Sequence, residues 1–224
     1  MPADDSHLSL RDEQKALTRR RLIDAAEVVF ARHGFHGASV EEVAREAGAT
    51  TGALYSNFAS KEALFLALFE HTAASDVQQY SDVFAAGATP EERVRGVAEL
   101  WMRILRERPD YFPLIIEFWA YAVRQPRLRS ELAARFASLR SASAQMVAQG
   151  ADERGIALSD EFADRLGLLI TSLGNGFALQ KLIDPEGVPD ELYGEILVLI
   201  FNALAALVRA DHAPETTQTE SPNA

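Results

Sequence analysis

Apolar residues recur at intervals of three and four along almost the whole chain, which is the period of an α-helix with one buried face. Near the N-terminus, for example, Ile23, Ala26 and Phe30 follow the i, i+3, i+7 spacing. β-Branched residues do not cluster into the alternating runs that are typical of strands. Because a helical period cannot keep apolar residues on one face of a strand, the sequence predicts an all-α fold.

Caps and breaks divide this pattern into about nine helices. Ser39 and Glu42 form a capping box, in which each side chain bonds the backbone N–H of the other residue. Thr89, Pro90 and Glu92 form a second strong helix start. The predicted helices span about 15–33, 39–48, 50–58, 60–84, 90–106, 110–123, 126–149, 159–182 and 189–209.

The composition is typical of a soluble globular chain and is compatible with a reducing compartment. Of 224 residues, 48% are hydrophobic and 25% are charged, so one domain or two small ones can bury a core. The absence of cysteine excludes disulfides, thiolate metal sites and a cysteine nucleophile, and it agrees with a cytoplasmic location. Residues 196–208, the longest apolar run, are interrupted by Asn202, and the polar N-terminus does not fit a signal peptide. We therefore expect no membrane contact.

Acidic residues outnumber basic ones, 33 to 22, and give a formal net charge of -11. This balance excludes a protein that binds nucleic acid or acidic membranes with its whole surface. Residues 15–61 differ, because they contain seven Lys and Arg against five acids. Within them, Arg19, Arg20 and Arg21 form the densest basic run, which fits either a solvated helix face or contacts with phosphates. Positive charge is thus concentrated in one N-terminal segment.

Two short predicted helices, joined by a turn at Gly48 and flanked by longer helices, have the proportions of a helix-turn-helix unit. In such a unit the second helix enters the DNA major groove while the first crosses the backbone. The positions that must pack inward are Val40, Val43, Ala44, Ala47 and Leu54. The outward positions are then Thr50, Thr51, Ala53, Tyr55 and Asn57, with Gly52 permitting close backbone approach. Alternatively, Tyr55 plugs the junction between the helices and Thr50 serves only as a cap.

The same stretch resembles the DNA-binding core of TetR-type transcriptional regulators. Its most specific part is Gly-x-Leu-Tyr-x-x-Phe-x-Ser-Lys-Glu at residues 52–62, and the motif-level resemblance covers about residues 18–70. The resemblance implies that the second short helix lies in the groove and that Ser39 and Lys61 hold phosphates, which a helix N-terminus favours. Many members carry histidine where this chain has Asn57, which can pair with adenine, contact a phosphate or cap locally.

The resemblance also implies how the chain is divided. We expect a flexible N-terminal arm at 1–14, a DNA-binding domain at 15–76, a larger helical effector-binding and dimerisation domain at 77–210, and a disordered tail at 211–224. The implied function is that of a ligand-responsive repressor. As a homodimer it would bind a palindromic double-stranded operator, and a small apolar or aromatic effector would release it.

The last two predicted helices, 159–182 and 189–209, are more apolar than one buried face needs. Gly174 and Gly176 in the first of them allow close helix approach. A buried core of a monomer would explain this composition. However, the two half-sites of a palindrome are bound by two copies of the protein, and a two-fold dimer needs a self-complementary face. Because the family resemblance also implies a four-helix dimer interface here, we expect a homodimer through these helices.

Aromatic residues gather in the half of the chain where TetR-type regulators hold their inducer. A buried core explains any one of them, but as a group they predict an apolar effector pocket with few polar anchors. The candidate effector-binding residues are Trp101, Phe112, Phe118, Trp119, Tyr121, Phe136, Asn175 and Phe177. The candidate polar anchors are Tyr121, Asn175 and Gln180. Glu117 and Arg124 flank the aromatic cluster and are compatible with surface charges.

Catalytic and metal-binding patterns are missing from the sequence. There is no Gly-x-Ser-x-Gly elbow and no phosphate loop. His33 and His36 straddle a glycine without a third ligand type nearby, so we expect no metal, no cofactor and no enzymatic activity. The alternative function is a helical small-molecule-binding or interaction protein that retains the N-terminal motif without reading DNA.

Overall fold

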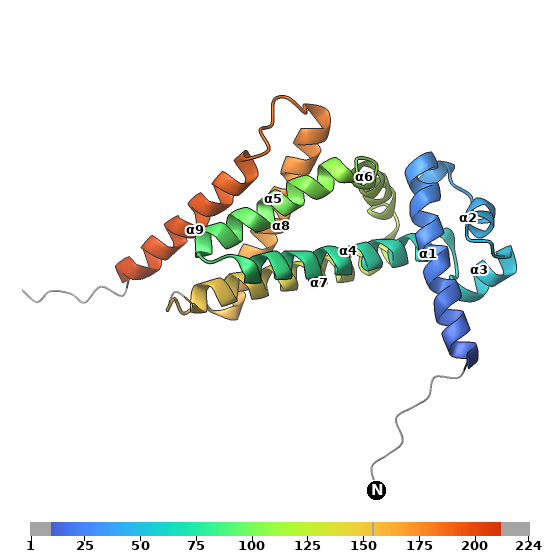
Figure 1. Ribbon diagram of the computed structural model, residues 1–224, viewed down its shortest axis with the longest axis horizontal. Coiled ribbons are helices and arrows are strands. Elements are labelled where there is room, and N and C mark those ends of the chain that lie inside the picture. Colours follow the sequence, from blue (N-terminus) through green and yellow to red (C-terminus); the bar gives the residue numbers. More distant parts are fainter. Residues whose placement is uncertain (1–9, 154, 212–224) are drawn as a thin grey trace, which may run out of the picture. The chain divides into compact units, whose positions relative to one another are not determined.

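The computed structural model describes residues 10–153 and 155–211, and within them every regular element is a helix. In chain order these are α1 (Leu10–Gly37), α2 (Val40–Glu46), α3 (Thr51–Asn57), α4 (Lys61–Ala86), α5 (Pro90–Glu107), α6 (Tyr111–Ala122), α7 (Pro126–Asp152), α8 (Asp160–Ile183) and α9 (Leu192–Asp211) (Figure 1). The predicted all-α fold and the number of helices are confirmed for the described part of the chain.

The starts of α2, α3 and α5 lie at the predicted caps. Ser39 and Glu42 bond each other's N–H groups at the start of α2, and Thr89 and Glu92 do the same at the start of α5. At the start of α3, the Thr50 hydroxyl accepts from the Ala53 N–H. These contacts span three residues each, which is why the sequence alone identifies them.

The first helix is longer than predicted. It begins at Leu10, so residues 10–14, which the sequence assigned to a flexible arm, are helical. Gly34 has φ 70° and ψ 173° and interrupts the helix where the stop was predicted, and a short helical turn follows it. Residues 1–9 of the predicted arm and residues 212–224 of the predicted tail lie outside the described residues.

The described chain forms two compact units. The first contains residues 10–80 and 103–139, and the second contains residues 81–102 and 140–211, except residue 154. Helices α4, α5 and α7 each run from one unit into the other. The units are not identical with the predicted domains, because α6 shares the first unit with α1, α2 and α3.

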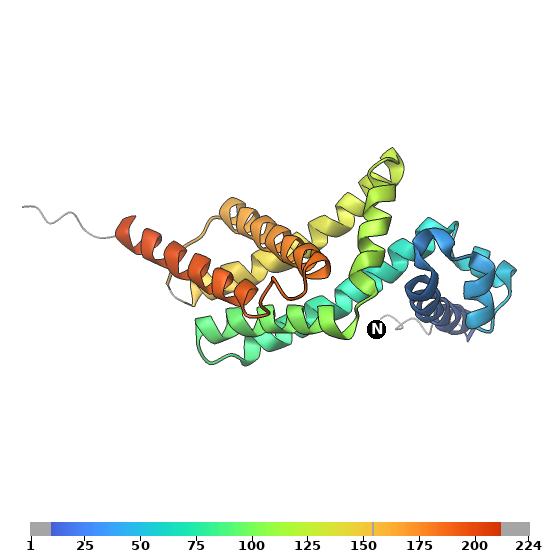
Figure 2. The ribbon, with the colours of Figure 1, turned by 90° about the horizontal axis from the view of Figure 1, so that it is seen from above.

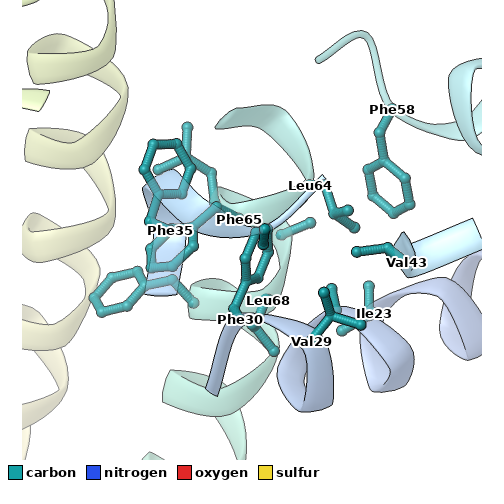
Figure 3. Packing of buried hydrophobic residues seen from close by; sticks show 14 of the residues in the cluster. Ile23, Val29, Phe30, Phe35, Val43, Phe58, Leu64, Phe65 and Leu68 are labelled. Atoms are coloured by element: carbon teal, nitrogen blue, oxygen red, sulfur yellow. The ribbon is translucent and has the colours of Figure 1, made fainter. Parts of the chain in front are cut away.

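The core of the first unit joins α6 to the N-terminal helices through aromatic rings. Phe65 of α4 stacks on Phe118 of α6 with ring centroids 4.1 Å apart. The Phe35 ring meets both of them edge to face, at 5.3 Å and 5.0 Å. Figure 3 shows Phe30, Phe35 and Phe65 together, with Val43 and Leu64 beside them. This core seats α2 and α3 against α1 (Figure 1).

The second unit depends on close approach between helices. In α8, a Cβ at Gly167 would lie 2.6 Å from the Arg140 carbonyl oxygen and 3.0 Å from the Ala144 nitrogen of α7. Glycine therefore lets the two backbones touch. After α8 the chain turns back, and α9 contacts α8 (Figure 2). Tyr193 of α9 is buried and its hydroxyl donates to the Ile170 carbonyl oxygen at 3.3 Å.

Candidate functional site

At the start of α2, the Ser39 side chain forms hydrogen bonds with Glu42 of the same protein. The Glu42 N–H donates to Ser39 Oγ at 3.2 Å, while Glu42 Oε2 accepts from the Ser39 N–H at 3.0 Å and from its hydroxyl at 2.9 Å. Hydrogen bonds from the Ser39 backbone and side chain lower the pKa of the Glu42 carboxyl. Because the hydroxyl both donates and accepts inside the capping box, its contact with a phosphate stays a prediction.

One face of α3 is buried and the opposite face is exposed. Leu54 and the following Phe58 are buried in the core, whereas the Tyr55 side chain is 52% exposed. Thr50, Gly52, Tyr55 and Ser56 are exposed, and Thr51, Ala53 and Asn57 are half-buried. This exposure agrees with the outward position of Tyr55, while a half-buried ring that packs at the helix junction stays a prediction. α3 thus offers a polar and aromatic face to a partner.

Asn57 caps the end of α3 locally. Its Nδ2 donates to the Ala53 carbonyl oxygen at 2.8 Å. Its Oδ1 is buried and has no hydrogen-bond partner among the residues that the structure describes. The side chain therefore fits local capping, which was one of three alternatives for this position, and pairing with adenine stays a prediction.

Two arginines of the basic run brace the ends of the short helices. Arg21 donates to the Ala47 carbonyl oxygen at 2.6 Å, just after α2, and Arg19 donates to the Asn57 carbonyl oxygen at 3.1 Å, at the end of α3. A cation is favourable at a helix C-terminus. Arg20 instead forms an exposed ion pair with Asp24 at 3.2 Å. The basic run thus has a structural role beside any contact with phosphates.

Lys61 lies at the start of α4, and its side chain contacts the connection between α1 and α2. Its Nζ donates to the His36 carbonyl oxygen at 3.3 Å and to the Ala38 carbonyl oxygen at 3.0 Å. The ammonium also lies 4.8 Å from the centroid of the Phe35 ring. An ammonium has three donors, so one remains for the predicted phosphate contact.

Tyr121, a predicted effector residue, contacts the N-terminal helices. Its hydroxyl donates to Glu62 Oε1 of α4 at 3.1 Å, and its ring lies against His36 with centroids 5.3 Å apart. The bond to Glu62 raises the pKa of the tyrosine. Burial raises the pKa of Glu62, but hydrogen bonds from Ser60, its own N–H and Tyr121 outweigh this, and the net shift is downward.

Sequence reasoning missed the polar contacts of Glu117 and Arg108 in the first unit. Glu117 of α6 accepts from backbone N–H groups at the end of α1, so it is not a free surface charge. Arg108 pairs with Glu27 of α1 at 2.7 Å and lies 3.7 Å from Asp76 of α4. Burial raises the pKa of Asp76 to about 6, against the lowering effect of Arg108. The acids are far from their partners in sequence, and for Glu117 the partner is backbone, which no residue pattern can reveal.

The structure divides the eight predicted effector residues between the two units. In the first unit, the Trp119 ring lies 6.0 Å from Phe112 and 5.1 Å from Phe136. The indole N–H of Trp119 is buried and has no hydrogen-bond partner within the described chain. Phe118 is fully buried in the aromatic core rather than beside these rings.

The remaining predicted effector residues belong to the second unit. The indole N–H of Trp101 donates to the Gly174 carbonyl oxygen of α8 at 3.3 Å. Phe177 lies against Tyr193 with ring centroids 5.4 Å apart, and burial raises the pKa of Tyr193. Asn175 is half-buried, whereas Gln180 is exposed.

α8 presents an apolar face that nothing in the described chain covers. Phe162, Leu169, Gly176 and Ile183 follow one another at intervals of seven, so they share one side of the helix, and all are exposed. A Cβ at Gly176 would meet no atom within 4 Å. By length and composition α8 is also apolar enough to cross a membrane, which the sequence reading did not anticipate, but a single helix of this kind is weak support for a span.

Among residues 10–153 and 155–211, no group of three or more His, Asp or Glu side chains is arranged to hold a metal ion. His33 and His36 are both exposed at the end of α1. The sites that the geometry offers are therefore the exposed face of α3, the two aromatic groups and the apolar face of α8.

Comparison with known proteins assigns both parts of the chain to one family. The model of the bacterial regulatory proteins of the TetR family matches residues 22–68, and that of the C-terminal part of BetI-type transcriptional repressors matches residues 90–216. The transcriptional repressor AcnR of Corynebacterium efficiens is 26% identical over 185 residues, which are 82% of this chain and 90% of AcnR.

Solved structures of regulators share the fold. FadR from Bacillus subtilis, solved with stearoyl-CoA, is 20% identical with a TM-score of 0.59, over 84% of this chain and 96% of FadR. A transcriptional regulator from Saccharomonospora viridis, solved with choline, is 19% identical with a TM-score of 0.64, over 84% and 96% of the two chains. Since the second family model alone covers more than half of the sequence, the chain belongs to the TetR family and is a DNA-binding transcriptional regulator.

Proposed function

We propose that the protein is a cytoplasmic homodimeric repressor that binds a palindromic operator and is released by a small apolar or aromatic effector, without catalysing a reaction. The observation that carries DNA reading is the exposed face of α3. Thr50, Gly52 and Tyr55 are exposed on a helix whose other face is buried. This helix lies within residues 15–61, where basic residues outnumber acids. We propose that the edge of the DNA contact is formed by Thr51, Ala53, Asn57, Ser39 and Lys61.

The apolar face of α8 supports dimerisation with a second copy. In addition to Phe162, Leu169 and Ile183, four more large apolar side chains of these two helices are exposed. They are Leu168, Leu179 and Leu182 on α8 and Leu199 on α9. A soluble monomer rarely exposes so many apolar side chains on adjacent helices. A two-fold axis lets one face bury itself against its copy and supplies the two readers that a palindrome needs.

For the effector we propose a molecule bound by aromatic rings in residues 77–210. Phe112, Trp119 and Phe136 form one aromatic group, and the unsatisfied indole N–H of Trp119 supports a ligand that carries a hydrogen-bond acceptor. Trp101 and Phe177 belong to a second group, near Tyr193. Choline and stearoyl-CoA, the ligands of two structural neighbours, are suitable first probes for displacement of the protein from DNA.

Selection of bound sequences from random DNA duplexes tests operator recognition. We expect the full-length protein to enrich a palindrome with half-sites about 34–36 Å apart. Tyr55→Ala should weaken binding to the enriched sequence about tenfold or more, as loss of a base-pair contact does. Val123→Ala, which truncates another exposed apolar side chain of the same unit, is the matched control. Failure to enrich any sequence would favour the alternative of a helical binding protein that does not read DNA.

A further inference from the structure

The connection between α1 and α2 is held from α6 by one carboxylate. Glu117 Oε2 accepts from the Phe35 N–H at 3.0 Å, and Oε1 accepts from the His36 N–H at 2.9 Å. Each carboxylate oxygen therefore serves one of two consecutive amides. Hydrogen bonds to a charged acceptor are stronger than those between neutral groups, so this contact is a firm link between α6 and α1.

Gly34 is required for this link in two ways. Its φ of 70° lies in the left-handed region that other residues rarely adopt. A Cβ at this position would also lie only 2.7 Å from Glu117 Oε2. Any side chain at position 34 would thus displace the carboxylate as well as strain the backbone. Gly34, which interrupts α1, thus leaves the space that the Glu117 carboxylate of α6 occupies.

The same connection is also held by Lys61 of α4. Lys61 binds the carbonyl oxygens of His36 and Ala38, while Glu117 binds the N–H groups of Phe35 and His36. The Phe35 ring, 4.8 Å from Lys61 Nζ, is buried in the aromatic core (Figure 3). An acid therefore binds two of the N–H donors of residues 35–38 and a base binds two of their carbonyl acceptors, which restricts how this short segment can reorient.

Residue 38 directly precedes the N-cap of α2. Ser39 begins the capping box, and α2 and α3 follow without a long connection. The position of residues 35–38 therefore sets where the helix-turn-helix begins relative to α1 and α6. From this geometry we infer that Glu117 is a positioning residue for operator recognition, which holds α2 and α3 in the orientation that a half-site requires.

This inference rests on the proposed function. It predicts that removal of Glu117 changes operator affinity in the direction opposite to that expected from charge alone. A surface acid repels phosphates, so its removal should strengthen binding to every DNA sequence. A positioning acid acts on the fraction of molecules whose α2 and α3 are correctly oriented, so its removal should weaken specific binding. Non-specific binding, which depends on phosphates alone, should not weaken.

The experiment compares Glu117→Gln and Glu117→Ala with the wild-type protein. Glu107→Gln removes an exposed acid from the same unit and is the control for charge. Fluorescence anisotropy would give the dissociation constants for the selected operator and for a scrambled duplex, over a range of salt concentrations. Circular dichroism of each variant would establish that it is folded.

Glu117→Ala should weaken operator binding about tenfold, because it removes two charge-assisted hydrogen bonds, and leave scrambled-duplex binding and the salt slope as in Glu107→Gln. Glu117→Gln should fall between alanine and wild type, since its amide keeps one acceptor oxygen but places a donor where the second is needed. In the wild-type protein, hydrogen exchange should show protected amides at Phe35 and His36, and Glu117→Gln should lose part of that protection.

Operator affinity of Glu117→Ala equal to that of Glu107→Gln would overturn the inference, as would parallel changes in specific and scrambled binding. If the alanine variant does not fold, Glu117→Gln with unchanged operator affinity and unchanged exchange at residues 35 and 36 would overturn it equally. A wild-type protein that selects no sequence would refute the proposed function instead, and the exchange measurement would still decide whether the link exists.

Discussion

Asp76 places a carboxylate in the interior of the first unit between charged neighbours. It is 9% exposed on α4, its Oδ1 lies 3.7 Å from Arg108 Nη1, and Arg108 pairs more closely with Glu27. The guanidinium also lies 4.2 Å from the centroid of the Tyr111 ring. Because the distance to Arg108 is too long for a hydrogen bond, burial dominates and raises the pKa of Asp76 to about 6.

The raised pKa makes stability depend on pH in a predictable direction. Since the folded chain binds this proton more tightly than the unfolded chain, whose pKa is 3.8, the contribution of Asp76 to stability is largest below about pH 4 and is lost as the pH rises through about 6. We predict that Asp76→Asn gains up to about 2 kcal/mol relative to wild type between pH 4.5 and 7.5. Urea unfolding at several pH values measures this difference.

The exposed Asp110, at the start of α6, provides the control for this prediction. Asp110→Asn also removes a carboxylate, but from an exposed position, so it should not reproduce the gain of Asp76→Asn. A constant difference between Asp76→Asn and wild type across these pH values would show that the pKa of Asp76 is not raised in the folded protein.

The contacts of a side chain could be predicted where its partner is close in sequence. They could not be predicted where the partner is distant. The bond between Ser39 and Glu42 spans three residues and follows from the capping-box pattern alone. The contacts of Glu117 and Lys61 reach backbone atoms more than twenty residues away, and backbone has no residue type to recognise. The exposed face of α3 was predictable because helical spacing assigns Leu54 inward and Tyr55 outward.

At the scale of elements, the order and the caps of the helices were predictable, whereas their packing was not. Apolar spacing and caps predicted all the helices of the described chain, with the largest error at the start of α1. Composition suggested that Gly174 and Gly176 both serve close helix approach. In the structure Gly174 faces Tyr193 and Trp101, Gly176 meets nothing within 4 Å, and Gly167 makes the closest helix contact. Which glycine touches a neighbour depends on tertiary geometry.

The contact at Gly167 leads to a prediction for the second unit. Alanine favours a helix by up to about 1 kcal/mol over glycine, but here its Cβ would collide with the backbone of α7. Backbone cannot rotate away as a side chain can, so we expect Gly167→Ala to destabilise the protein by about 1–3 kcal/mol. Thermal and urea unfolding measure this loss.

Ser172→Ala, at an exposed position of the same helix, is the comparison. It should change stability by less than about 0.5 kcal/mol, as exposed substitutions usually do. Equal stability of Gly167→Ala and wild type would mean that α7 and α8 are not in backbone contact in solution.

At the scale of the whole molecule, dimerisation and DNA reading are proposed to depend on each other. One α3 reads one half-site, so operator affinity depends on a second copy that is held at the matching distance. The acidic residues outside residues 15–61 repel phosphates and disfavour other orientations of the protein on DNA. Loss of the dimer should therefore reduce operator binding without any change at the DNA-contacting residues.

The substitution pair Leu169→Glu and Ile183→Glu tests this dependence, because both side chains lie exposed on the seven-residue spacing of α8. Two-fold symmetry would bury each charge twice, so the dimer dissociation constant should rise by at least about a thousandfold. Val123→Glu, an equally exposed position outside this face, should leave the dimer intact. Light scattering after size exclusion would give the oligomeric state, and anisotropy would give operator affinity. A variant that remains dimeric would place the interface elsewhere, and a monomer with wild-type operator affinity would refute reading by a dimer.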